Sequence, residues 1–168
     1  MNTRLVLSTI ASALLAACAS VDIGHGLVPG QSMQSDVEAS LGRPADVRKL
    51  ANGETELWYP QMPYGFGSYA ARIAPDGRLI ALEQRLTEQT VGRIVPNKTT
   101  AGEVLDLVGP PYRKDPFPRM EREIWTYKFQ SFPAPKALFV QLSADDLVRE
   151  VYLMDDPEVP RLGAGSPP

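Results

Sequence analysis

Few residues of this 168-residue chain have the type and spacing that catalysis requires. The only histidine, His25, lies between two glycines in a segment that we interpret as a flexible connection ahead of the first folded module. Ser68 follows Gly-Phe-Gly, but the Gly-x-Ser-x-Gly motif is not satisfied, and no histidine in a predicted folded region could serve as its base. We therefore predict no catalytic residue and expect that the protein is not an enzyme.

Metal and cofactor sites are not predicted either. No histidine, cysteine and carboxylate residues occur at the spacing of a zinc site, and the glycine-rich signatures of phosphate binding are missing from the sequence. The acidic pairs Asp145-Asp146 and Asp155-Asp156 could ligate a cation, but aspartate is common in turns and at chain ends, which is how we interpret them. We expect no metal, no cofactor and no small-molecule substrate.

The single cysteine, Cys18, indicates chemistry of another kind. Residues 1–4 are polar and carry one positive charge, and residues 5–15 form an apolar run that is shorter than the roughly 20 residues of a membrane-spanning helix. This order is typical of a secretory signal peptide. Leu15-Ala16-Ala17-Cys18 resembles the lipobox of bacterial lipoproteins, whose cysteine is lipidated and becomes the mature N-terminus. A plain secretory cleavage site and an uncleaved anchor are the alternatives.

A lipid anchor at Cys18 would place the protein at a membrane. We predict a signal peptide over residues 1–17 and a lipidated tether over residues 18–27, which reaches at most ~35 Å. By analogy with lipoprotein sorting, Ala19 and Ser20, with no aspartate in second place, favour the outer membrane. We expect the periplasmic face, and the cell surface is the alternative. Without Arg4 the mature chain has 16 basic and 20 acidic residues, a net charge of −4, which argues against a nucleic-acid partner.

The rest of the chain contains an internal duplication. Val28-Pro29 recurs as Val95-Pro96, 67 residues later. Five further pairs share this offset: Ser32 with Thr99, Val37 with Val104, Gly42 with Gly109, Pro44 with Pro111 and Trp58 with Trp125. We predict two modules, over residues 28–90 and 91–155, followed by a disordered tail rich in proline and glycine over residues 156–168.

Each copy begins with a pattern that predicts a short helix. Ser32 and Thr99 are predicted N-caps, because a hydroxyl oxygen can accept hydrogen bonds from the first turn of a helix. Apolar residues then recur at helical spacing until Gly42 and Gly109, where each helix is expected to end. Helices of about ten residues are marginal alone, so each is expected to pack on a sheet.

Alternating apolar residues predict the strands of these sheets. They are expected over residues 47–50, 55–59, 69–74 and 79–82 in the first copy, and 123–129, 137–142 and 147–153 in the second. Trp125, Tyr127 and Phe129 would share one face, and Trp58 and Trp125 are expected in the core as equivalent residues. The predicted fold class is α+β: two tandem repeats, each a short helical segment packed on a small antiparallel β-meander.

The order of these motifs resembles a known family. A lipobox, Val-Pro-Gly, a helix opened by Ser32, Leu-Gly-x-Pro, an aromatic strand with Trp58-Tyr59 and then Asp-Gly-Arg are similar to the BamE (SmpA/OmlA) type of outer-membrane lipoprotein. The resemblance covers roughly residues 26–86 and, more weakly, 94–154. It implies a helix-plus-strands module that assists β-barrel assembly by contacting partner proteins. A tandem of two such modules is also similar to the β-lactamase inhibitor proteins, which grip an enzyme.

Two loops carry the candidate binding residues. They join predicted strands over residues 60–68 and 130–136, and they contain Met62, Tyr64, Phe66 and Phe132. Rigid aromatic rings bury much area at little entropic cost, which favours protein recognition, although these rings could instead fold back over the sheet edge. We expect a non-catalytic protein-binding or scaffold lipoprotein of the cell envelope. The alternatives are a periplasmic enzyme inhibitor and a purely structural envelope protein.

Overall fold

The computed structural model describes residues 23–159. The predicted signal peptide, the lipobox with Cys18 and most of the proline-rich tail lie outside these residues, so lipidation of Cys18 stays a prediction. Within the described range, no helix is both long and apolar enough to cross a membrane.

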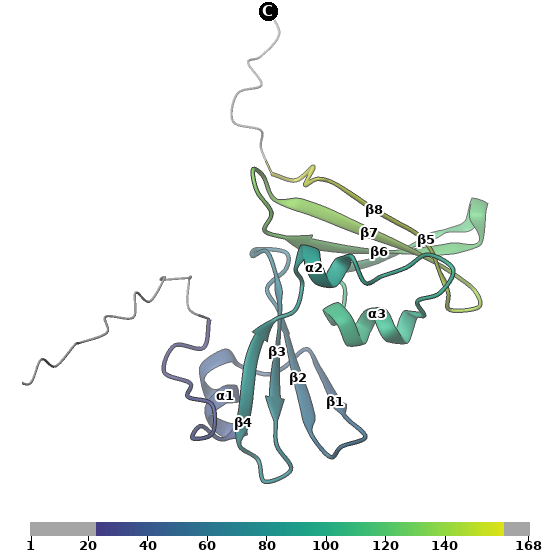
Figure 1. The fold of residues 1–168 in the computed structure, drawn as a ribbon. Helices are drawn as coiled ribbons and strands as arrows, with labels where there is room; N and C mark the ends of the chain where they lie inside the picture. Colours follow the sequence, from purple (N-terminus) through teal and green to yellow (C-terminus); the bar gives the residue numbers. More distant parts are fainter. Residues whose placement is uncertain (1–22, 160–168) are drawn as a thin grey trace, which may run out of the picture.

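The fold is mixed α and β, and strands dominate it (Figure 1). The first antiparallel sheet has the order β1 (Asp46–Lys49), β2 (Thr55–Pro60), β3 (Ser68–Ile73) and β4 (Leu79–Gln84). The second has the order β5 (Arg113–Phe117), β6 (Arg122–Phe129), β7 (Lys136–Ser143) and β8 (Val148–Asp155). The helical segments are α1 (Gln34–Leu41), α2 (Glu88–Val91), α3 (Ala101–Val108) and the 3-10 turn η1 (Pro118–Met120).

Two elements of this fold differ from the sequence-based expectation, which placed neither β5 nor α2. Strand β5 reads Arg-Lys-Asp-Pro-Phe and has no apolar alternation, and Pro116 interrupts it. Such a sequence is tolerated because β5 is an edge strand that pairs only with β6. The α2 helix has four residues, too few to show a helical period.

Hydrogen bonds around the helix of the first module recur in the second, which is consistent with two tandem modules. The amide of Val28 donates to Ser32 Oγ at 2.9 Å, and the amide of Val95 donates to Thr99 Oγ1 at 2.8 Å. A second repeated bond ties the start of each helix to a strand turn: Gln34 N donates to Gly77 O at 2.9 Å, and Ala101 N donates to Asp146 O at 2.7 Å.

The predicted helix caps were wrong by one residue. The N-caps are Met33 and Thr100, and the hydroxyls of Ser32 and Thr99 instead close the preceding turn by accepting from the amides described above. In α3 the cap is reciprocal, because Thr100 Oγ1 accepts from Glu103 N at 3.3 Å while Glu103 Oε2 accepts from Thr100 N at 2.7 Å. This bond from the Thr100 amide lowers the pKa of Glu103.

The predicted equivalence of Trp58 and Trp125 was also wrong. Ala45 N donates to the carbonyl of Trp58, whereas in the second module Tyr112 N donates to the carbonyl of Thr126. The structural counterpart of Trp58 is therefore Thr126, because the β5–β6 hairpin is one residue longer than the β1–β2 hairpin: Asp46 pairs with Trp58, whereas Arg113 pairs with Thr126. A slip of one residue in a strand moves a side chain to the opposite face, so the two tryptophans point in different directions.

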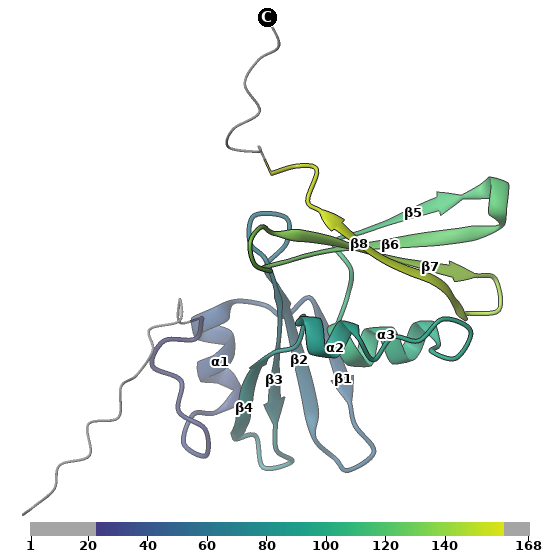
Figure 2. The same ribbon diagram turned by 45° about the horizontal axis from the view of Figure 1, so that its top comes forward.

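Each sheet buries one face against its own helix. In the second sheet, Trp125, Tyr127 and Phe129 form this face as predicted, and they pack with Val104 and Val108 of α3. In the first sheet, Leu57 and Tyr59 pack on the α1 side; the rest of this cluster is Val37, Ala71, Ile73 and Leu79. Figures 1 and 2 show α2 and α3 lying between the two sheets, so α3 is flanked by both modules.

Candidate binding surfaces

The outer face of the first sheet, opposite α1, is occupied by the second module. Trp58 lies on this face and is completely buried. Its ring contacts Gly109, the residue that ends α3: a Cβ at this position would lie 2.7 Å from Trp58 Cζ3 and 2.9 Å from Cδ2. Gly109 also has a φ of +77°, which favours glycine. The position therefore allows a close approach that a side chain would prevent.

Charged groups near this contact also join the first module to α3. Arg48 forms an ion pair with Asp106 of α3, and Arg85 Nη2 donates to the carbonyl of Asp106 at 3.0 Å. Arg85 also pairs with Glu56 at 3.4 Å and lies 5.6 Å from the centroid of the Trp58 ring. Only 7% of the Glu56 side chain is exposed, so Arg85 supplies a cation to a carboxylate that is largely removed from water.

Met62, one of the four candidate binding residues, contributes to the contact between the modules. It is half-buried and packs against the hydrophobic core of the second module. Its Sδ accepts a hydrogen bond from the amide of Lys128 at 3.0 Å. Nearby, Ser131 Oγ donates to Glu88 of α2 at 2.5 Å. These contacts are intramolecular, so Met62 belongs to the contact between the modules and not to an exposed binding surface.

The corresponding outer face of the second sheet is exposed along β8, whereas Thr126 at its centre is buried. We call it the open face, and it consists of Ile124 and Thr126 of β6, Phe139 of β7, and Tyr152 and Met154 of β8, which alternate with the core-facing residues. The rings of Phe139 and Tyr152 are stacked, with centroids 5.0 Å apart and an interplanar angle of 17°. Tyr152 is 40% exposed and Met154 is 47% exposed. The face thus presents an ordered aromatic pair to its surroundings.

Both ends of the open face are polar and fixed. At one end, Lys128 pairs with Asp156 at 3.4 Å and with Glu158, so the segment after β8 covers this end. At the other end, Arg122 pairs with Glu150 at 3.1 Å and donates to Gln141 at 2.7 Å. The apolar centre with a charged rim is the usual composition of a protein interface.

The other three candidate binding residues lie on two neighbouring loops. Tyr64 in the β2–β3 loop is 98% exposed, and Phe132 in the β6–β7 loop is 94% exposed, whereas Phe66 is half-buried. Phe66 lines a hollow of about 520 Å³ together with Gln130 of the other loop, so the two loops lie side by side, as Figures 1 and 2 also show. The two most exposed rings therefore occur on neighbouring loops, one from each module.

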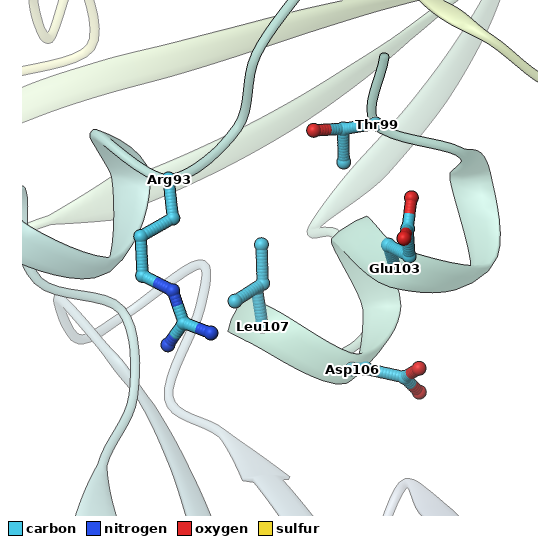
Figure 3. A pocket seen from close by; sticks show the side chains of 5 residues that line it. All are labelled: Arg93, Thr99, Glu103, Asp106 and Leu107. Carbon is cyan, nitrogen blue, oxygen red and sulfur yellow. The ribbon is translucent and has the colours of Figure 1, made fainter.

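A second hollow, of about 260 Å³, is lined by charged residues of α3 and by Arg93, which follows α2 (Figure 3). Arg93, Glu103 and Asp106 line it, but their arrangement does not suggest catalysis. In Figure 3 the Arg93 guanidinium lies beside Leu107, while the carboxylates of Glu103 and Asp106 point away from it. The Glu103 carboxylate caps α3, and the Asp106 carboxylate pairs with Arg48. Among residues 23–159, no group of three or more His, Cys, Asp or Glu side chains could hold a metal ion.

The acidic pairs also have structural contacts. Asp145 accepts from Ser143 and pairs with Arg149 at 2.5 Å, and the bond from Ser143 lowers the pKa of Asp145. Asp155 pairs with Lys136 at 2.6 Å, and the neighbouring Asp156 is the buried partner of Lys128.

Comparisons with known proteins give the chain no family. No protein-family description matches it, and no curated protein does. Among solved structures, it is similar to a DUF4309 family protein (YjgB) from Bacillus subtilis, with 18% identity, 79% of this chain and 84% of that chain covered, and a TM-score of 0.30. It is also similar to an extracellular protein containing an SCP domain from Bacillus anthracis, with 14% identity, 88% of this chain and 50% of that chain covered, and a TM-score of 0.30.

Proposed function

We propose that this chain is an outer-membrane lipoprotein with two BamE-like modules, which acts as a non-catalytic protein-binding or scaffold element in envelope or outer-membrane protein assembly. One observation carries the proposal. The outer face of the first sheet binds a protein element, the end of α3, whereas the corresponding face of the second sheet keeps Tyr152 and Met154 exposed. The outer face of the first sheet is thus covered by α3, whereas the equivalent face of the second sheet has exposed residues on β8.

The element bound to the outer face of the first sheet indicates what kind of partner the open face of the second sheet would bind. On the first sheet the bound element is the last turn of a short helix that ends in glycine and presents Asp106 to Arg48. The register places Asp115 on the open face where the first sheet has Arg48, because Asp115 pairs with Ile124 as Arg48 pairs with Glu56. We therefore propose that the partner is a folded protein that offers a helix end with a basic side chain near Asp115.

The predicted lipid anchor limits the partner to proteins close to the membrane. Leu27, inside the predicted tether, packs against the core of the first module. Ile23 is the fifth residue after Cys18, a reach of about 18 Å when extended. With a lipidated Cys18, the modules stay close to the membrane, which supports a partner that is itself a membrane-associated envelope protein.

Site-directed crosslinking in the native host tests the proposal. A tagged chain is crosslinked beside a Cys18→Ala version, and the recovered proteins are identified. Recovery of β-barrel assembly components only when Cys18 is intact would support the proposal. A soluble enzyme recovered equally with both versions would favour the inhibitor function, and recovery of the chain alone would favour a purely structural role; either result would overturn the proposal.

The contact between the modules supports a scaffold more than an inhibitor. An inhibitor that grips an enzyme between two modules needs an open surface there. In this chain Trp58, Gly109 and the Arg48–Asp106 pair occupy that position.

A further inference from the structure

Ile23, inside the predicted tether, lies beside the two aromatic loops. Ile23 lines the hollow of about 520 Å³ together with Gly65 and Phe66 of the β2–β3 loop and Gln130 of the β6–β7 loop. The same hollow is closed by Tyr69 and Gln84, at the end of the first sheet where β2 finishes and β3 begins. The chain therefore enters the first module beside the two loops.

The composition of these loops differs from that of the whole chain. Residues 61–67 and 130–135 contain no Asp, Glu, Lys or Arg, whereas 22% of the chain is charged. The side chains at their tips, Tyr64 and Phe132, are 98% and 94% exposed. Two rings held almost fully in water, with no charge on either loop, are costly to leave exposed and gain from an apolar environment.

The chain supplies such an environment at this end. Because Ile23 is five residues from Cys18, an acyl-modified Cys18 would lie within about 18 Å of Ile23 and hence beside the loops. Aromatic rings with a polar group, such as tyrosine, concentrate at the boundary between lipid headgroups and acyl chains. The short tether therefore brings the uncharged loops close to the membrane surface that holds the anchor.

We propose that Tyr64 and Phe132 insert into the headgroup–acyl boundary of the bilayer that carries the anchor, so that the two loops seat the protein on the lipid surface in a fixed orientation. This inference rests on the proposed lipidation of Cys18. It assigns the exposed loop aromatics to lipid and leaves the open face of the second sheet to the protein partner. The anchor holds the chain at the membrane, and the loops determine which end faces it.

Depth-dependent quenching tests this seating with the lipidated full-length protein as isolated from its host. Because Cys18 carries the acyl groups, a single added cysteine at Tyr64, Phe132 or Asn52 is the one thiol that accepts an environment-sensitive fluorophore. Asn52 is the matched control: it is exposed and lies in the β1–β2 hairpin, at the other end of β2. Each labelled protein is reconstituted into phosphatidylethanolamine vesicles that contain phosphatidylglycerol and brominated acyl chains, and flotation is measured alongside.

The proposal expects a strong loss of emission from the labels at 64 and 132 and none from the label at 52. Equal emission from all three labels in protein that floats with the vesicles would overturn the seating while leaving the anchor intact. Failure to float would instead disprove the anchor itself, and with it this inference. Photocrosslinking of position 64 to a protein in the native membrane, with no quenching by lipid, would overturn the proposal in favour of a protein contact.

Discussion

The ring of Trp58 in the first sheet lies directly against Gly109, which ends the helix of the second module. A Cβ at position 109 would come within 3 Å of three ring carbons of Trp58. Both residues are therefore parts of one contact that joins the two modules. The repeat offers an internal comparison, because Gly42 ends α1 with nearly the same backbone angles but a Cβ there would meet nothing within 4 Å.

Replacing Gly109 is expected to destabilise the protein more than replacing Gly42. Gly42→Ala introduces only an unfavourable backbone conformation, which costs about 1–3 kcal/mol. Gly109→Ala adds overlap with the Trp58 ring, which raises the cost by about 1–3 kcal/mol more. Chemical denaturation of both variants measures the difference. Equal losses of unfolding free energy would mean that the Trp58–Gly109 contact does not hold the modules together.

Arg85 is expected to matter more than an exposed arginine. Arg85→Met leaves the carboxylate of Glu56 largely buried without its cation, at a cost of about 3 kcal/mol. The double variant Arg85→Met, Glu56→Leu removes the charge as well and should recover most of this loss. A double-mutant cycle on the unfolding free energy gives the coupling. A loss of less than about 1 kcal/mol in the single variant is the value for a surface pair and would show that solvent reaches Glu56.

Alkaline pH is expected to weaken the fold through buried tyrosines. Burial and the nearby charge of Glu38 raise the pKa of Tyr59 to about 12, compared with about 10 in the unfolded chain. Since the folded state holds the proton more tightly, the stabilising contribution of Tyr59 is fully present below pH 10 and is lost as the pH rises from 10 to 12. Burial also raises the pKa of Tyr127, so both residues contribute in this direction.

Phenylalanine variants separate the two tyrosines. The hydroxyl of Tyr59 has no hydrogen-bond partner among the described residues, so Tyr59→Phe should change stability little at pH 7 and should reduce the loss above pH 10. Tyr127 Oη donates to Gly109 O at 3.1 Å, so Tyr127→Phe should cost about 1 kcal/mol at pH 7. Thermal melts across this pH range check both variants. An unchanged alkaline loss in Tyr59→Phe would assign it to other groups.

The duplication and most strands were accessible from the sequence because the local signals are strong. Gly42 and Gly109 end both helices, and the alternation of Trp125, Tyr127 and Phe129 correctly identified the core face of β6. Strand β5 could not be predicted in this way, because its position depends on pairing with β6 and its own residues are mostly charged.

The functional surfaces were harder to predict for a related reason. The 67-residue offset matched Trp58 to Trp125. The β5–β6 hairpin contains one additional residue, so the two tryptophans lie on opposite faces of their sheets. Matching residues in the sequence does not reveal this change of face, because it depends on how the strands pair. The open face was missed although Phe139, Tyr152 and Met154 occur at alternate positions, because their exposure depends on where α3 packs. Tyr64 and Phe132 were identified from their loops, and their near-complete exposure required the structure.

The most direct test of the proposed function uses two adjacent residues of β8 that point to opposite faces. Tyr152 lies on the open face and is 40% exposed, whereas Leu153 lies on the other face and is 46% exposed. A photoreactive amino acid is placed at 152 or at 153 in the anchored protein and activated in the native host. We expect crosslinks to an outer-membrane assembly protein from position 152 and none from position 153. Equal crosslinking from both positions, or from neither, would contradict the assignment of the open face as the partner-binding surface.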